Sequence, residues 1–217
     1  MPADPAPENA APEQSPPMVV APVLLAGSGV RLEPLSPAHR PGLAAAIEDG
    51  ALWQIPLTFV PHPDDLGAFV DDAAAVLRAG RELAFAIIDS SVDAPAGRVV
   101  GSTRFRAIEA RHRRVEIGFT FLAASAQRSH VNTAAKYLML RHAFEAWGCH
   151  RVELLTDERN ARSRAAILRL GAREEGLLRC HMVMRDGHVR HSVIFSLIAA
   201  EWPKARRALE RKLDPGS

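Results

Sequence analysis

Apolar and polar positions alternate between strand-like and helix-like spacing along this chain, and the changes divide it into elements. The run VRLEPL at residues 30–35 alternates apolar and polar side chains, which predicts a half-buried strand. In the next two stretches, 36–50 and 62–80, apolar residues recur every three or four positions, and each stretch ends in a glycine. We therefore expect two helices, joined by the apolar loop ALWQIPLTFVP at residues 51–61.

Strand-like runs follow at residues 82–89, 98–108 and 113–122, and the spacing becomes helical over RSHVNTAAKYLMLRHAFEAWG at 128–148. The remaining pattern predicts, in order, a strand at 151–156, a helix at 160–171, two strands around Asp186-Gly187 between 176 and 198, and a terminal helix at 201–213.

The order of these elements indicates the fold class. Only the segment from about residue 115 to 156 contains a strand–helix–strand crossover, the connection that makes two strands parallel. The other strands should pair antiparallel. We therefore predict an α/β (α+β) fold with a mixed, mostly antiparallel sheet and one parallel pair, and not a doubly wound one.

The N-terminal segment departs from this pattern. MPADPAPENAAPEQSPP holds six prolines, three acidic residues and no Lys or Arg, so it lacks the basic region of a signal or transit peptide. It buries too little apolar surface to become ordered, and we expect disordered tails at residues 1–18 and 214–217. Residues 19–213 are then predicted to form a single domain, which suits a chain of 217 residues.

Charge, cysteines and missing motifs exclude several function classes. The net charge is +2 and the basic residues are spread along the chain, which does not favour nucleic acid as a partner. No apolar run reaches the roughly 18 residues of a membrane span. Cys149 and Cys180 form no CxxC pair, which is typical of reduced thiols in a cytoplasmic protein. The chain has no P-loop, no nucleophile elbow and no HExxH, and we expect no metal site.

The long helix at 128–148 begins with groups suited to an anion. A helix leaves its first N–H groups unpaired and carries partial positive charge at that end, so a phosphate can bind there. Arg128 could reach such an anion; equally, Asn132 or Thr133 could merely cap the helix. The flanking strands favour a ligand, because two parallel strands that diverge open a crevice facing the helix N-terminus.

From residue 97 to 203 the sequence resembles the Gcn5-related N-acetyltransferases (GNAT), and within them the RimJ/RimL-like ribosomal-protein N-terminal acetyltransferases. The matching pieces are EIGF, VNTAAKYLMLRHAFE, RVELLTDERNARSRAAILRLGAREEGLLR and FSLIAAEWP. The resemblance implies a GNAT-like fold, with helices on both faces of the sheet and the parallel pair splayed at acetyl-CoA. It also implies transfer of an acetyl group from acetyl-CoA to a primary amine, by direct attack in a ternary complex.

In this family the turn before the long helix binds the pyrophosphate, and pantetheine lies between the splayed strands. The family's loop reads Q/R-x-x-G-x-G/A, whereas His130 and Asn132 replace its glycines here, and their side chains could crowd the phosphates. Asn160 matches an asparagine that contacts pantetheine, and it could also cap its own helix. The contacts expected for acetyl-CoA are Phe119, Phe121, Leu122, Gln127, Arg128, Ser129, His130, Val131, Asn132, Thr133, Asn160 and Arg164.

Acetyl transfer from a thioester requires a neutral amine, a polarised carbonyl and a thiolate that leaves, preferably protonated. Glu116 is the candidate base, with a plain ion pair to an arginine as the alternative. A backbone N–H near residues 119–122 could polarise the carbonyl. Ser163 matches a serine of the ribosomal-protein subgroup and is the candidate acid. Tyr137, the one tyrosine of the chain, lies within the long helix, where we expect a packing or surface role.

The acceptor amine should enter beside the first two helices. The loop between them offers Trp53, Gln54 and Phe59, either for recognition or for packing. The subgroup implies a protein N-terminus as acceptor, and a small amine is equally compatible with the mild charge. Two alternatives stay open: a catalytically weak or inactive GNAT-fold acyl-CoA-binding module, and a protein-interaction module. Unpaired strand edges also allow a homodimer.

Overall fold

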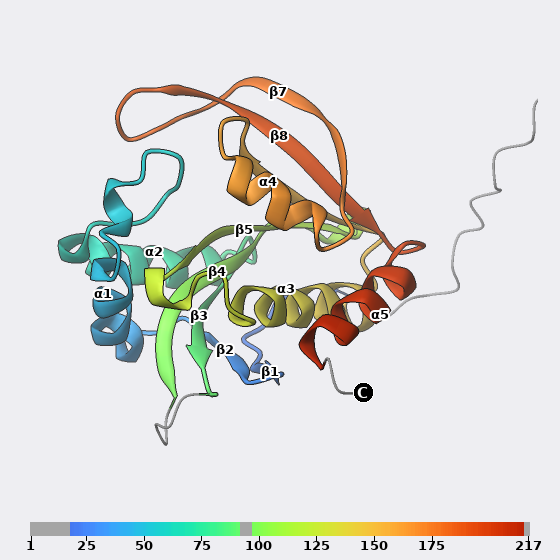
Figure 1. Ribbon diagram of the computed structural model, residues 1–217, viewed down its shortest axis with the longest axis horizontal. Coiled ribbons are helices and arrows are strands. Elements are labelled where there is room, and N and C mark those ends of the chain that lie inside the picture. Colours follow the sequence, from blue (N-terminus) through green and yellow to red (C-terminus); the bar gives the residue numbers. More distant parts are fainter. Residues whose placement is uncertain (1–17, 92–96, 215–217) are drawn as a thin grey trace, which may run out of the picture.

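The computed structural model describes residues 18–91 and 97–214, and most of the predicted tails lies outside them. Eight strands form one sheet in the order β1-β2-β3-β4-β5-β6-β8-β7 (Figure 1). The strands are β1 (Leu25–Gly27), β2 (Val30–Pro34), β3 (Leu83–Asp89), β4 (Arg98–Glu109), β5 (Arg114–Leu122), β6 (Arg151–Asp157), β7 (Arg173–Val183) and β8 (Val189–Ile198). The α-helices are α1 (Arg40–Glu48), α2 (Leu66–Arg78), α3 (Val131–Arg141), α4 (Ala161–Leu168) and α5 (Trp202–Leu213). The assignment of residues 19–213 to one domain stays a prediction.

The strand pairing confirms the predicted mixed sheet. β5 and β6 run parallel and are connected through α3, whereas the other neighbouring strands pair antiparallel. Helices lie around the sheet (Figure 1), with α1 and α2 near β3 and β4 and with α3 packed against β1 and β2. This is the GNAT-like α/β arrangement expected from the sequence.

Two local features differ from the prediction. Residues 25–27 form strand β1, which pairs with β2 and is too short for its hydrophobic alternation to be visible in the sequence. The helix predicted to reach residue 148 is α-helical only to Arg141 and continues as a π-helical turn at His142–Ala146. In this turn the N–H of Trp147 donates to the His142 carbonyl at 3.0 Å. One extra residue in a turn leaves little trace in the spacing of apolar residues.

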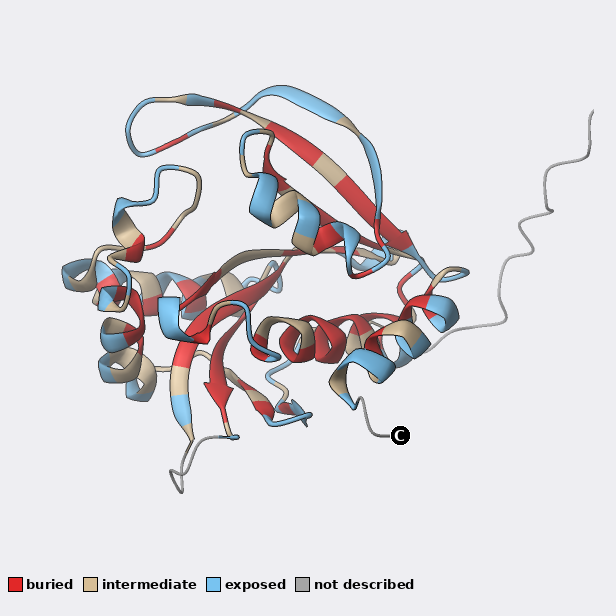
Figure 2. Cartoon of the chain, in the orientation of Figure 1, coloured by how far each residue is buried: buried red, intermediate tan, exposed pale blue. Residues whose placement is uncertain are grey.

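The core is organised around α3 and has two clusters. The larger cluster includes most of α3 and the inward side chains of β2 to β6 and β8, and α3 is buried along almost its whole length (Figure 2). The smaller cluster contains Leu43, Ile47, Leu66 and Phe121, and it joins α1 and α2 to the sheet. Phe121 belongs to this cluster and its neighbour Leu122 to the larger one, as expected for adjacent residues on a strand that face opposite sides.

Among residues 18–91 and 97–214, no helix combines the length and the apolar character that crossing a bilayer requires.

Candidate active site

The parallel strands β5 and β6 separate near their middle and open a crevice. They pair only at Arg114–Arg151, Val115–Val152 and Glu116–Glu153, after which β5 continues to Leu122 and β6 to Asp157. Backbone N–H and C=O groups alternate in direction along a strand, so the groups of β5 beyond Glu116 that point toward β6 have no strand partner there. α3 begins beyond the end of β5 (Figure 1). The predicted splay of the parallel pair is therefore present.

A β-bulge lies at the start of this crevice. Gly118 pairs with Arg104 and Phe121 with Ser102, so that Phe119 and Thr120 together stand opposite Thr103. Phe119 has φ +47°, a left-handed conformation that is uncommon for a residue with a side chain. The bulge turns Thr120 toward α3, where it contacts Lys136. It therefore changes the direction of the backbone N–H groups within residues 119–122, the segment expected to polarise a thioester carbonyl.

Glu116 lies three residues before Phe119, with its carboxylate directed along β5 toward Gly118. A Cβ on Gly118 would lie 2.5 Å from Glu116 Oε1, so the missing side chain of Gly118 leaves room for this carboxylate. Burial raises the pKa of Glu116, the nearby Arg106 opposes this shift, and Glu153 adds to it. Arg106 Nη1 lies 3.6 Å from Glu116 Oε1. A carboxylate with a raised pKa beside an open backbone segment can accept a proton at neutral pH.

Lys136 of α3 lies behind the bulge and was not predicted as a site residue. Its side chain is buried, and its Nζ donates to Thr120 Oγ1 at 2.5 Å and to Thr103 Oγ1 at 3.2 Å. Burial lowers the pKa of Lys136 to about 7, while the carboxylate of Glu116 favours the charged form. The sequence did contain a signal, because the run AAKYLML is apolar on every side of a helix except at this lysine.

The burial of Lys136 should make the stability of the folded protein depend on pH. Folded Lys136 loses its proton near pH 7, whereas an ordinary lysine does so near 10.5, so the unfolded state binds more protons between these values. The free energy of unfolding of the wild type should therefore rise with pH in this range. Lys136→Met should be more stable than the wild type at pH 6, and its advantage should shrink by about 1 kcal/mol per pH unit above pH 7.

Urea unfolding from pH 6 to pH 9 measures this dependence. Lys212→Met is the matched control, because Lys212 is exposed and its Nζ donates to the Arg169 carbonyl at 2.7 Å. The difference in the free energy of unfolding between Lys212→Met and the wild type should not vary with pH. A difference between Lys136→Met and the wild type that stays constant across the range would contradict the prediction.

The loop before α3 presents backbone donors at the end of the crevice. Ser129 Oγ donates to the Ala126 carbonyl at 2.6 Å and accepts from the Val131 N–H at 3.2 Å. The first hydrogen bond within the helix runs from the Ala134 N–H to the His130 carbonyl. The backbone N–H groups of Asn132 and Thr133 precede it in the first turn, where the helix itself supplies no carbonyl to accept from them.

His130 points away from this first turn. Its Nε2 lies 3.2 Å from where a Cβ on Gly29 would be, next to Ser91. The imidazole of this exposed residue therefore lies beside the β1–β2 turn. Arg128 is exposed and has φ +60°.

Gln127 and α4 connect the two walls of the crevice. The side chain of Gln127 donates to the Leu122 carbonyl at 2.9 Å and accepts from Arg162 Nη2 at 2.7 Å. This Gln127–Arg162 bridge joins the end of β5 to the first turn of α4. Asn160 Oδ1 accepts from the Ser163 N–H at 3.0 Å, so Asn160 caps α4.

The two remaining side chains predicted near α4 differ in their surroundings. Ser163 is partly exposed in the first turn of α4, close to the end of β6. Arg164 instead turns away toward β7, where its Nη2 pairs with Glu174 Oε2 at 3.0 Å. Arg164 is therefore occupied by a neighbouring carboxylate.

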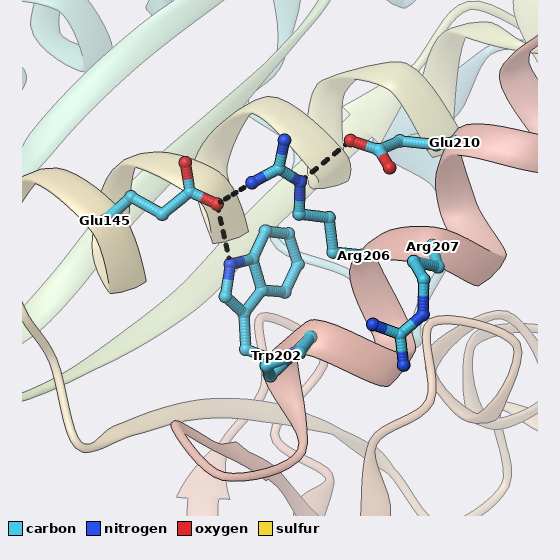
Figure 3. Close-up of a pocket in the computed structure, with 6 residues that line it drawn as sticks. Glu145, Trp202, Arg206, Arg207 and Glu210 are labelled. Atoms are coloured by element: carbon cyan, nitrogen blue, oxygen red, sulfur yellow. Dashed lines mark hydrogen bonds and ion pairs between the residues drawn. The ribbon is translucent and has the colours of Figure 1, made fainter.

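Tyr137 faces α5 and not the crevice. Its hydroxyl donates to Glu210 Oε1 at 2.8 Å. Figure 3 shows the groove beside it, where Arg206 lies between Glu210 and Glu145 at 2.8 and 3.0 Å and where the indole N–H of Trp202 donates to Glu145 at 2.9 Å. These contacts join α5 to α3 and to the π-helical turn that follows it, and Tyr137 has the packing role that was one of its two expected roles.

The loop between α1 and α2 brings one of its three predicted residues to the bulge. The ring centroids of Phe59 and Phe119 are 5.5 Å apart, and Arg106 Cζ lies 4.0 Å above the Phe119 ring. Trp53 packs edge-on against a histidine of the same loop, and Gln54 is exposed.

The tip of the β7–β8 hairpin contacts the α1–α2 loop. Arg185 at its tip donates through Nη1 to the Trp53 carbonyl at 3.1 Å and through Nη2 to the Val60 carbonyl. These two hydrogen bonds join the hairpin to the α1–α2 loop, and Figure 1 shows the tip of the β7–β8 hairpin extending toward that loop.

In the described part of the chain no three His, Cys, Asp or Glu side chains gather in a way that could hold a metal ion.

Comparisons with known proteins agree with this geometry. The family model of the GNAT acetyltransferase domain matches residues 30–173. The chain is similar in structure to a GCN5-related N-acetyltransferase from Brucella melitensis, at 28% identity and a TM-score of 0.79 over 96% of this chain and 91% of that one. It is also similar to a T. thermophilus protein described as an acetyltransferase, at 33% identity and a TM-score of 0.76 over 90% of this chain and 100% of that one.

A further similar structure is that of Mycobacterium smegmatis RimJ in complex with CoA-disulfide, at 26% identity and a TM-score of 0.71 over 88% of this chain and 93% of that one. A comparison with curated proteins finds no match. The family model covers well over half of the sequence, and the splayed strands agree with it, so the chain belongs to the GNAT acetyltransferase family.

Proposed function

We propose that this protein is an acetyl-CoA-dependent N-acetyltransferase of the RimJ/RimL-like subgroup, which transfers an acetyl group to a primary amine in a ternary complex. One observation carries the proposal. The open end of the β5–β6 crevice, the bulge at Phe119 and Thr120, and the buried carboxylate of Glu116 meet at one place. A thioester, a carbonyl-polarising donor and a base must be brought together in just this way for acyl transfer.

The crevice fits acetyl-CoA as an extended co-substrate. Its pyrophosphate would accept hydrogen bonds from the N–H groups of Asn132 and Thr133, with Arg128 adding positive charge. Its pantetheine amides would pair with the exposed backbone of β5, as a further strand does. His130 does not oppose this placement, because its ring lies against Gly29. The similarity to RimJ, which was solved with CoA-disulfide, supports the same ligand here.

In the proposed reaction Glu116 accepts the proton of the acceptor ammonium, directly or through a water. The neutral amine then attacks the thioester carbonyl, and backbone N–H groups within residues 119–122 stabilise the negative charge that develops on its oxygen. The carbon–sulfur bond breaks and the CoA thiolate leaves, and the second proton of the attacking nitrogen passes to this thiolate, so that the products are the amide and the CoA thiol. Ser163 is the proposed hydrogen-bond donor to this thiolate.

The acceptor is proposed to approach from the face that carries Phe59, Trp53 and Gln54. A protein N-terminus and a small primary amine both fit, and the subgroup favours the first. Arg185 joins this loop to the β7–β8 hairpin, and a slender acceptor is therefore proposed to suit this side better than a bulky one. A cytoplasmic location and a homodimer stay predictions, which microscopy of the tagged protein and sedimentation can test.

Calorimetric titration with acetyl-CoA tests the ligand. We expect a Kd in the micromolar range, corresponding to about −8 kcal/mol, and weaker binding of ATP. Arg128→Glu should weaken acetyl-CoA binding about tenfold, because it replaces a favourable charge near the pyrophosphate by a repulsive one. His130→Ala should change the Kd by less than about threefold, since its ring points away from the cradle.

Two results would contradict parts of the proposal. No binding at millimolar acetyl-CoA would remove the acyl-CoA site and favour the protein-interaction module. Micromolar binding without thiol release, for any amine in a screen of peptides and small amines, would favour an acyl-CoA-binding module without turnover.

A further inference from the structure

The buried side-chain nitrogen of Lys136 lies directly behind the bulge of β5. Lys136 Nζ, Thr120 Oγ1 and Thr103 Oγ1 form a triangle, because the two hydroxyls that accept from the lysine are themselves 2.8 Å apart. Thr120 is one of the two residues that form the bulge, and Thr103 is the residue of β4 that the bulge faces. The three contacts therefore converge on the irregular part of β5.

This arrangement costs more free energy than an apolar side chain packed at the same place would. A lysine nitrogen held by two neutral hydroxyls in a closed interior loses its hydration in either protonation state without gaining a carboxylate in direct contact. The neighbouring side chains Ala135 and Met139 are fully buried, so an apolar side chain would suit the same place. The charged residues of β4 near the bulge, Arg104 and Arg106, extend toward Glu82 and Phe119 on the opposite face of the sheet.

The bulge itself needs support. Phe119 has φ +47°, which costs a residue with a side chain roughly 1 kcal/mol or more relative to an extended strand. The adjoining segment of β5 has lost its pairing with β6, so it is held by β4 on one side only. The contacts of Thr120 with Lys136 and Thr103 are therefore a direct restraint on the conformation of this segment.

We propose that Lys136 is a positioning residue for acetyl transfer: through Thr120 and Thr103 it holds the bulge of β5 so that the backbone N–H groups within residues 119–122 point at the thioester carbonyl. Lys136 itself touches neither substrate. The inference rests on the proposed acetyltransferase function, since it assigns a role in polarising the acetyl carbonyl.

Steady-state kinetics of Lys136→Met and Thr120→Val test the role. Methionine keeps the length and volume of the lysine, and valine keeps the shape of the threonine, while each removes the Lys136–Thr120 hydrogen bond. We expect kcat to fall about tenfold to a hundredfold, because a donor that is misplaced by a fraction of an ångström polarises the carbonyl poorly. The KM for acetyl-CoA should change by less than about threefold. Lys212→Met, on the exposed last turn of α5, is the control and should match the wild type.

Infrared spectroscopy of bound acetyl-CoA gives a reading that does not need turnover. With ¹³C at the acetyl carbonyl, the carbonyl band of the wild-type complex should lie at lower frequency than in free acetyl-CoA, because hydrogen bonding weakens the C=O bond. In both variants the band should move back toward the free value. Thr120→Val keeps the test decisive if Lys136→Met fails to fold.

The outcomes separate this inference from the proposed function. If the wild type binds acetyl-CoA and releases no thiol with any amine, the proposed function fails. The carbonyl band of bound acetyl-CoA then still shows whether Lys136 holds the backbone N–H groups that polarise the carbonyl. Unchanged kcat and an unchanged band in a folded variant would overturn the inference while leaving the function intact. No shift of the band in the wild type would also overturn it. Absence of acetyl-CoA binding would remove both.

Discussion

Replacing Glu116 by glutamine is expected to lower kcat about a hundredfold or more, because the amide cannot accept a proton from the acceptor ammonium. Glutamine has the same shape, so it fits the space above Gly118 that the carboxylate occupies. The Kd for acetyl-CoA should stay within about threefold of the wild type, since the expected cofactor contacts lie farther along β5, in the loop and first turn of α3, and at the start of α4. Thiol release under saturating amine, combined with calorimetry, measures both quantities.

The pH dependence of kcat/KM tests whether Glu116 is the base. Burial raises the pKa of Glu116 above its ordinary value of 4.5, so kcat/KM of the wild type should fall as the pH decreases through this raised pKa. The Gln variant should lose this acid limb along with most of its rate. Tyr137→Phe is a suitable control, because its hydroxyl contacts Glu210 on α5 and its loss should leave the rate unchanged. Full activity in Glu116→Gln would exclude Glu116 as the base.

Gly101→Ala is expected to lower the free energy of unfolding by about 3 kcal/mol or more. A Cβ on Gly101 would lie 2.0 Å from the Phe121 carbonyl oxygen, a backbone atom that no side-chain rotation can move away. β4 and β5 would have to separate next to the bulge. Acetyl transfer should therefore also fall in any folded fraction, because the backbone of residues 119–122 would move with β5.

Gly176→Ala provides the matched comparison. Gly176 also lies within a strand, β7, but no heavy atom lies within 4 Å of where its Cβ would be. This variant should remain within about 0.5 kcal/mol of the wild type, as surface substitutions usually do. Chemical unfolding of both variants measures the difference. Equal stabilities would show that β4 and β5 can move apart at little cost.

The sequence was sufficient to predict the sheet and its one parallel pair, because these depend on features that are visible in a pattern. Strand-like runs alternate over many residues, and a crossover through a helix makes its strands parallel. The place where the anion site was expected also follows from pattern, since the long helix has to begin after the strand that ends at Leu122.

The details of the site could not be predicted in the same way. The bulge depends on a positive φ at Phe119, and phenylalanine gives no signal for that conformation as glycine does. The replacement of a family glycine by His130 suggested crowding, but its ring packs on Gly29, a residue about a hundred positions away in the sequence. Lys136 could not be predicted because a lysine in a helix is usually solvated, and only the burial of α3 along almost its whole length makes it unusual.

The contacts of Arg185 have a consequence for how fast different acceptors can bind. The strands from β5 to β7, the hairpin tip, the α1–α2 loop and the Phe59–Phe119 contact form a closed circuit of contacts that begins and ends on β5. A chain terminus can enter through such a ring of contacts end first. The side chain of an internal lysine in a folded protein can enter only after the contacts of the ring have opened. The association rate, more than the affinity, would then distinguish a free N-terminus from an internal lysine, and two hydrogen bonds from one arginine would set that difference.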